Sequence, residues 1–105
     1  MSLTMNDPTW SPDLTLACER LAERLHATGV THPVAAAVAL TARGHLGLSQ
    51  SAFAERIGMS AARVAELEAG HVPFADLPDE VSAPLGPGLL RLAALNAELG
   101  PPPAL

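Results

Sequence analysis

Residues 43–73 read RGHLGLSQSAFAERIGMSAARVAELEAGHVP, and they contain the most informative local signals of the sequence. Ser49 precedes a helix-forming run over residues 50–57, where its hydroxyl can accept a hydrogen bond from the first turn. Gly58 follows at the position where a residue in the left-handed conformation would end that helix, since glycine adopts this conformation without steric cost. The pattern therefore predicts a short helix that stops at a tight turn.

A second helix is expected directly after the turn. Ser60 is again a favoured N-cap residue, and the helix runs over residues 61–69 until Gly70 ends it. Ala54 supplies a small side chain where the two helices must cross closely. The apolar side chains that can converge on one core are Phe53, Ile57, Met59, Val64 and Leu67. Two short helices joined by a turn over a shared core indicate a helix-turn-helix.

The segment resembles the phage repressor and Cro-like helix-turn-helix family, also called the Xre family, over roughly residues 33–73. That family's pattern asks for Gln at the start of the first helix, a hydrophobic residue followed by Ala, Gly in the turn, and branched aliphatic residues in the second helix. The matching residues here are Gln50, Phe53, Ala54, Gly58, Val64 and Leu67. The resemblance also implies an internal ion pair between Arg43 and Glu68. It therefore implies an all-α, lambda-repressor-like bundle.

The resemblance further implies how DNA would be held, because the second helix of the motif enters the major groove in this family. The groove-facing residues, carried over by position, are Ala61, Ala62, Arg63 and Glu66. Gln50 and Ser60 would hold phosphates, helped by backbone N–H groups at the helix starts. Arg63 could contact a phosphate or read guanine, whereas alanine offers only apolar contact, for example to a thymine methyl.

The charge balance limits the expected affinity for DNA. Six Lys+Arg stand against eleven Asp+Glu, giving a net charge of -5, whereas proteins that coat nucleic acid usually carry a positive surplus. If Glu68 holds Arg43, only Arg56 and Arg63 remain in the motif to contact phosphates, so Arg56 joins the expected DNA-binding set. Few phosphates would then be neutralised by each monomer, and affinity should depend on dimerisation. A two-fold dimer would place its second helices about 34 Å apart over a palindromic site.

We expect amphipathic helices on both sides of the motif, and no strand pattern persists anywhere in the sequence. Apolar residues recur at helical spacing over residues 13–28, with Asp13 as a plausible N-cap. Another helix is expected from Pro33 to about His45. The expected organisation is a flexible tail (1–12), one helical domain (13–99) with the helix-turn-helix at about 49–70, and a Pro-rich tail (100–105).

The segment after the motif departs from the family pattern. Residues 72–88 contain four prolines and are interpreted as a linker with one short turn after Asp76. Beyond it, leucines at helical spacing predict an amphipathic helix over 88–99. The apolar stripes of this helix and of the helix over 13–28 fit either the core of a monomer or the interface of a homodimer. The homodimer would form through one helix or both.

Other classes of protein find little support in the sequence. Cys18 is the one cysteine, which excludes an internal disulfide, fits a reducing cytoplasm and indicates a buried or inert thiol. The four histidines form no i,i+4 pair, so we expect no metal and no cofactor. A Gly-rich phosphate loop and a Ser-His-Asp arrangement are absent, which argues against an enzyme. No apolar run approaches the roughly 20 residues that a membrane span needs.

Two functions fit these observations. The first is a dimeric, sequence-specific DNA-binding regulator of transcription, either an autoregulating repressor or the antitoxin of a toxin–antitoxin pair. The second is a protein-interaction module that keeps the fold and docks a protein partner through its alanine-rich helix or its acidic linker. The completeness of the motif favours the first function, and the net charge favours the second.

Overall fold

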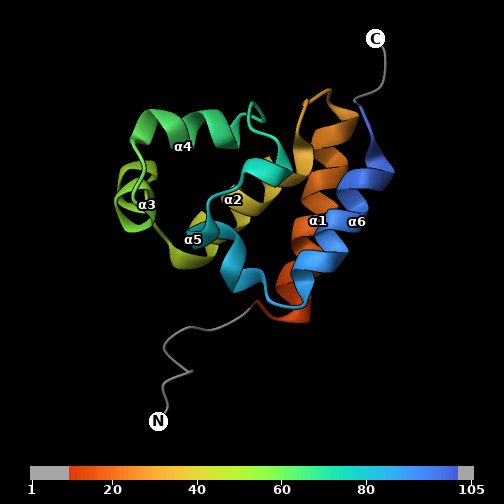
Figure 1. Ribbon diagram of the computed structural model, residues 1–105, viewed down its shortest axis with the longest axis horizontal. Helices are drawn as coiled ribbons and strands as arrows, with labels where there is room; N and C mark the ends of the chain where they lie inside the picture. Colours follow the sequence, from red (N-terminus) through yellow and green to blue (C-terminus); the bar gives the residue numbers. More distant parts are fainter. Residues whose placement is uncertain (1–9, 102–105) are drawn as a thin grey trace.

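The computed structural model describes residues 10–101, and every regular element in that range is helical, as predicted (Figure 1). The α-helices are α1 (Pro12–Ala27), α2 (Pro33–Leu46), α3 (Gln50–Ile57), α4 (Ala61–Glu68), α5 (Asp79–Ser82) and α6 (Gly88–Leu99). Two 3-10 turns, η2 (Phe74–Asp76) and η3 (Ala83–Leu85), flank α5. Most of the expected N-terminal tail lies outside the described residues.

Helix α2 lies at the centre of the bundle. Its residues Val34–Ala39 are all fully buried, and four of these six residues are alanines. A helix that is apolar on every side must be covered on every side, and α2 contacts α1, α4, α5 and α6. The small alanine side chains allow these neighbours to approach the α2 backbone, so α2 fixes the position of the motif relative to the flanking helices.

The start of α1 differs from the prediction by two residues. Ser11, not Asp13, is the N-cap, because the Ser11 Oγ accepts a hydrogen bond of 3.1 Å from the Leu14 N–H. Pro12 takes the first helical position, where a backbone N–H would have no partner within the helix, so its absence costs no hydrogen bond. Trp10 also belongs to the fold, since its N–H donates to the Pro84 carbonyl oxygen at 2.9 Å. The interpretation of residues 10–12 as part of a flexible tail is therefore wrong.

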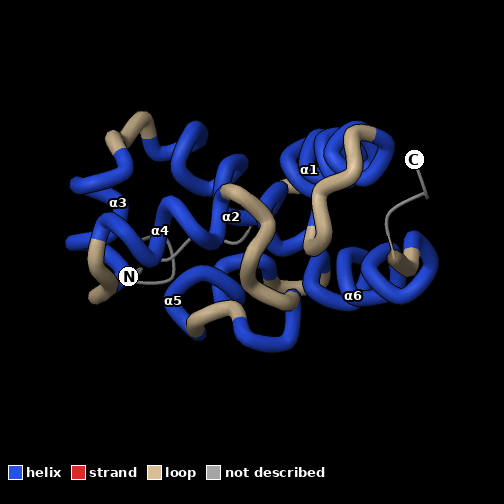
Figure 2. The backbone as a smooth tube through the Cα atoms, turned by 90° about the horizontal axis from the view of Figure 1, so that it is seen from above, coloured by secondary structure: helices blue, strands red, loops and turns tan. Residues whose placement is uncertain are grey.

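Helices α1 and α6 lie side by side, at the end of the molecule opposite α3 and α4 (Figures 1 and 2). Cys18, Ala22 and Leu92 on their facing sides are fully buried. Glu19 and Arg91 form an ion pair across the two helices, with Nε and Oε2 2.7 Å apart. The inward faces of both apolar stripes are therefore part of the monomer core.

The proline-rich segment after the motif is more ordered than predicted. Instead of a linker with one turn, it forms η2, α5 and η3, and it buries Leu77, Val81 and Leu85. These three residues follow a four-residue spacing, which would mark a helix face if prolines did not interrupt the sequence. Pro78 stands just before α5, where proline is tolerated, so the chain folds as successive short turns along one buried row.

Candidate nucleic-acid interface

Local hydrogen bonds build the turn between α3 and α4. The Ser49 Oγ accepts from the Ala52 N–H at 3.1 Å, and the Ser60 Oγ accepts from the Arg63 N–H at the same distance. Gly58 adopts φ +72°, in the left-handed region that ends α3. Both serines therefore cap their helices as predicted, and each helix is eight residues long.

The two helices share the expected core. The buried side chains of this unit are Phe53, Ala54, Ile57, Val64 and Leu67, with Met59 partly buried against them. Helix α4 packs on both α3 and α2, so one face of α4 is buried while the other faces solvent along its whole length (Figure 1). The exposed face is therefore held rigidly by the core beneath it.

A buried carboxylate joins α2, α3 and α4. Arg43 on α2 binds Glu68 on α4 through two hydrogen bonds, Nε to Oε2 at 2.6 Å and Nη2 to Oε1 at 3.2 Å. The Arg43 Nη1 donates to the Leu48 carbonyl oxygen at 3.1 Å, and the Gln50 Nε2 donates to the Glu68 Oε1 at 2.8 Å. The Glu68 side chain is only 6% exposed. Its hydrogen bond raises the pKa of the Arg43 guanidinium.

The exposed face of α4 contains almost no free charge. Ala61, Ala62, Arg63 and Glu66 are all exposed there, which is where the resemblance places the groove-facing residues. Ala65 is also exposed between them, and its spacing of four residues from Ala61 could have identified it from the sequence. The Arg63 Nη1 donates to the Glu66 Oε1 at 3.1 Å, so this surface is formally neutral.

Two members of the expected DNA-binding set have other contacts. The side-chain amide of Gln50 is half-buried, and its Nε2 donates to the Glu68 Oε1. The Arg56 side chain lines a cleft that α3 forms with α1, α2 and α5, together with Phe53 and Ile57. Arg56 lies on α3, one helical turn after Phe53, and contributes to this cleft and not to the exposed face of α4.

Features of other chemistries are few among residues 10–101. Burial raises the pKa of the Cys18 thiol to about 12, so this thiol stays protonated at neutral pH. Within the described part of the chain, no three His, Cys, Asp or Glu side chains gather where they could hold a metal ion. The described helices include none that is both long and apolar enough to cross a bilayer.

An eight-residue helix, a turn at a left-handed glycine and a second eight-residue helix with one free face define a helix-turn-helix of the DNA-binding class. The comparison with family models agrees, since residues 41–73 match the family described as Helix-turn-helix. Residues 41–73 are therefore similar to this family, and the match supports an Xre-type, lambda-repressor-like helix-turn-helix. Neither a curated protein nor a solved structure matches the chain.

Proposed function

We propose that this protein is a cytoplasmic, sequence-specific transcriptional regulator that binds DNA as a homodimer through α4. The observation that carries the proposal is the exposed, rigidly supported face of α4 within a matched helix-turn-helix. Ser60 and the first N–H groups of α4 would meet a phosphate, and Ala61, Ala62 and Arg63 would enter the major groove. Arg63 can leave its ion pair with Glu66 and turn toward DNA, because this exposed pair contributes only a few tenths of a kcal/mol.

DNA binding should depend only weakly on salt. With Arg56 lining the cleft, Arg63 is the one cation that we assign to DNA in each subunit, so the two Arg63 side chains of a dimer would displace about two counterions. The slope of log affinity against log salt should then be near -2. Fluorescence anisotropy with DNA selected from a random library, or taken from upstream of the protein's own gene, measures this slope across salt concentrations.

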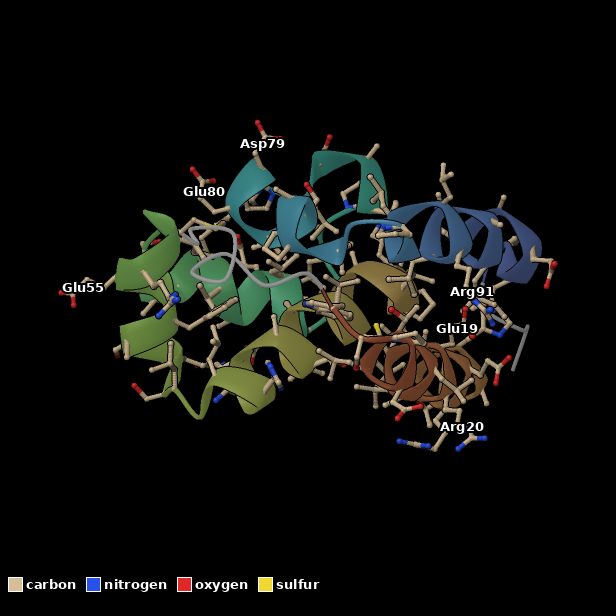
Figure 3. All side chains as sticks on the ribbon, turned by 90° about the horizontal axis from the view of Figure 1, so that it is seen from below. Glu19, Arg20, Glu55, Asp79, Glu80 and Arg91 are labelled. Carbon is tan, nitrogen blue, oxygen red and sulfur yellow. The ribbon has the colours of Figure 1, made fainter. Side chains whose placement is uncertain are left out.

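Substitutions on α4 test the docking face. Arg63→Ala should weaken specific binding by about 1–3 kcal/mol if this residue reads guanine. Glu66→Gln should strengthen non-specific binding, because it removes a negative charge that would face the phosphates. Arg20→Ala is the matched control, since Arg20 projects into solvent from α1, far from α4 (Figure 3). If Arg63→Ala binds DNA as the parent does, the docking face has been misplaced.

The alternative function, protein interaction through the same fold, is favoured by one specific observation. The exposed face of α4 carries alanines and one internally paired arginine, so it presents little that could attract a polyanion. An apolar α4 face of this kind would suit an apolar surface of a protein partner. Absence of DNA binding by the parent protein even at low salt would transfer the proposal to this function.

The homodimer would form through the outer face of α6. Leu90 on that face is 79% exposed, and the exposed Ala94 and Ala97 lie beside it at helical spacing, with the exposed Arg91 and Glu98 at the edge of this face. Figures 1 and 2 place α6 and α4 at opposite ends of the molecule, whose longest extent is 51 Å. A two-fold contact at α6 would therefore separate the α4 helices by more than the 34 Å of one duplex turn, and half-sites should be spaced accordingly.

Light scattering tests this arrangement. The parent protein should be a dimer at micromolar concentration, and Leu90→Glu should make it monomeric, because each interface would then bury two like charges near the axis. Leu16→Glu on α1 is the matched control at another exposed leucine and should leave the dimer intact. A parent protein that stays monomeric well above micromolar concentration would contradict the dimer, and dissociation by Leu16→Glu alone would move the interface to α1.

A further inference from the structure

The cleft beside α3 is a feature that the helix-turn-helix does not explain. It has a volume of about 430 Å³, within the range of sites for small molecules. Its walls come from the start of α1, the end of α2, α3 and the α5–η3 segment. The apolar lining consists mainly of Trp10, Leu14, Leu46, Phe53, Ile57 and Val81. Leu46 is more exposed than most leucines of this fold, so apolar surface remains open at the cleft.

The polar groups of the cleft differ in their bonding. Arg56, His45 and Glu80 all contribute to the lining. Within residues 10–101, no carboxylate lies within ion-pair distance of the Arg56 guanidinium, whereas Arg43, Arg63 and Arg91 each have one. Figure 3 shows Glu80 projecting outward from α5. The cleft thus combines an apolar wall with a guanidinium that has donors to spare.

We propose that this cleft is a binding site for a small amphipathic anion, an aromatic or aliphatic carboxylate or sulfonate. Its apolar body would lie against Trp10, Leu14 and Leu46, and its anionic group would accept hydrogen bonds from Arg56. A carboxylate or a sulfonate can present two oxygens to the fork of donors on a guanidinium, and the opposite charges make this pair stronger than a neutral hydrogen bond. His45 adds a second donor at the same rim, whereas Glu80 opposes the anion.

The site is independent of the proposed DNA-binding surface. Arg56 lies on the α5 side of α3, and the residues assigned to DNA lie on α4. A ligand in the cleft would bridge the first helix of the helix-turn-helix to α1 and α5. The proposal therefore concerns a ligand of the chain itself and stands whether the α4 face meets DNA or a protein partner.

Trp10 makes the test direct, because it is the chain's one tryptophan and forms part of the cleft wall. The probe is 8-anilinonaphthalene-1-sulfonate, titrated into the folded full-length protein by calorimetry and by energy transfer from Trp10. N-phenyl-1-naphthylamine, which has the same rings without the sulfonate, is the neutral comparison. We expect one sulfonate probe per chain, bound more tightly than the neutral probe.

Variants then separate the anionic and apolar contacts. Arg56→Gln should weaken binding of the sulfonate about tenfold and leave the neutral probe almost unchanged. Leu46→Asn should weaken both probes, and Glu80→Gln should tighten the sulfonate. Arg20→Gln is the control for a general charge effect. Leu16→Asn is the control for the second cleft that Trp10 also lines, between α1 and α6.

Several results would overturn the proposal. Binding of neither probe would show that the cleft is not open to a ligand, whether because other residues of this chain or a second copy fill it. Equal binding of both probes with no effect of Arg56→Gln would show that no anion is recognised. A loss of binding in Leu16→Asn with none in Leu46→Asn would place the site in the second cleft. Thermal melts of each variant confirm that the protein tested is folded.

Discussion

Arg43→Ala should lower the free energy of unfolding by about 3 kcal/mol, the lower end of the range for breaking a buried pair. The substitution removes two of the three hydrogen bonds that the Glu68 carboxylate accepts from side chains in the described fold and leaves it with Gln50. Glu68 is 6% exposed, so solvent cannot replace the lost donors. Arg43 itself is 27% exposed, which is why the expected loss stays at the lower end.

Urea denaturation at neutral pH measures the loss. The matched control is Arg63→Ala, which breaks the exposed pair with Glu66 and should change stability by less than about 0.5 kcal/mol. A double variant, Arg43→Met with Glu68→Leu, should recover much of the loss, because it removes the charge that Arg43→Ala leaves unpaired. If Arg43→Ala unfolds at the same urea concentration as the parent, Glu68 is solvated and the pair contributes no more than a surface one.

The sequence was sufficient for the helix-turn-helix because its signals are local. Ser49 and Ser60 can only cap the helix that directly follows them, and Gly58 ends α3 through its own backbone conformation. The α1 cap was missed because Ser11 and Asp13 are both good N-cap residues two positions apart. Pro12 is the feature that favours Ser11. Proline lacks a backbone N–H and is tolerated at the first helical position, which Pro12 occupies when Ser11 is the N-cap.

Features that depend on tertiary packing were harder to predict. The row of Leu77, Val81 and Leu85 is buried because α2 needs a cover on that side, a requirement that the prolines conceal in the sequence. Arg56 lines the cleft beside α3, which the sequence did not indicate, while its expected contact with DNA stays a prediction. Its position around α3 relative to the exposed face of α4 depends on how the two helices cross, and the sequence does not state that angle.

Gly70→Ala should destabilise the protein by about 2–5 kcal/mol, the sum of a backbone and a packing cost. Gly70 is buried just after α4 with φ +83°, a conformation that costs an L-residue about 1–2 kcal/mol. A Cβ at Gly70 would also lie 2.2 Å from the Val30 Cγ1. Val30 is β-branched and stiff, and the His32 N–H holds the Gly70 carbonyl oxygen at 3.1 Å, so neither side moves aside freely.

Gly58→Ala separates the two costs. Gly58 has nearly the same backbone conformation, with φ +72°, but nothing lies within 4 Å of the position of its Cβ, so only the backbone cost of about 1–2 kcal/mol should appear. The excess loss in Gly70→Ala, measured by urea denaturation, then reports the contact with Val30. That excess should shrink when Gly70→Ala is made in a Val30→Ala background, as a double-mutant cycle requires for two groups in contact. Equal losses for Gly58→Ala and Gly70→Ala would mean that Val30, in the loop between α1 and α2, moves aside at no cost in free energy. The contact between this loop and the end of α4 would then not be rigid.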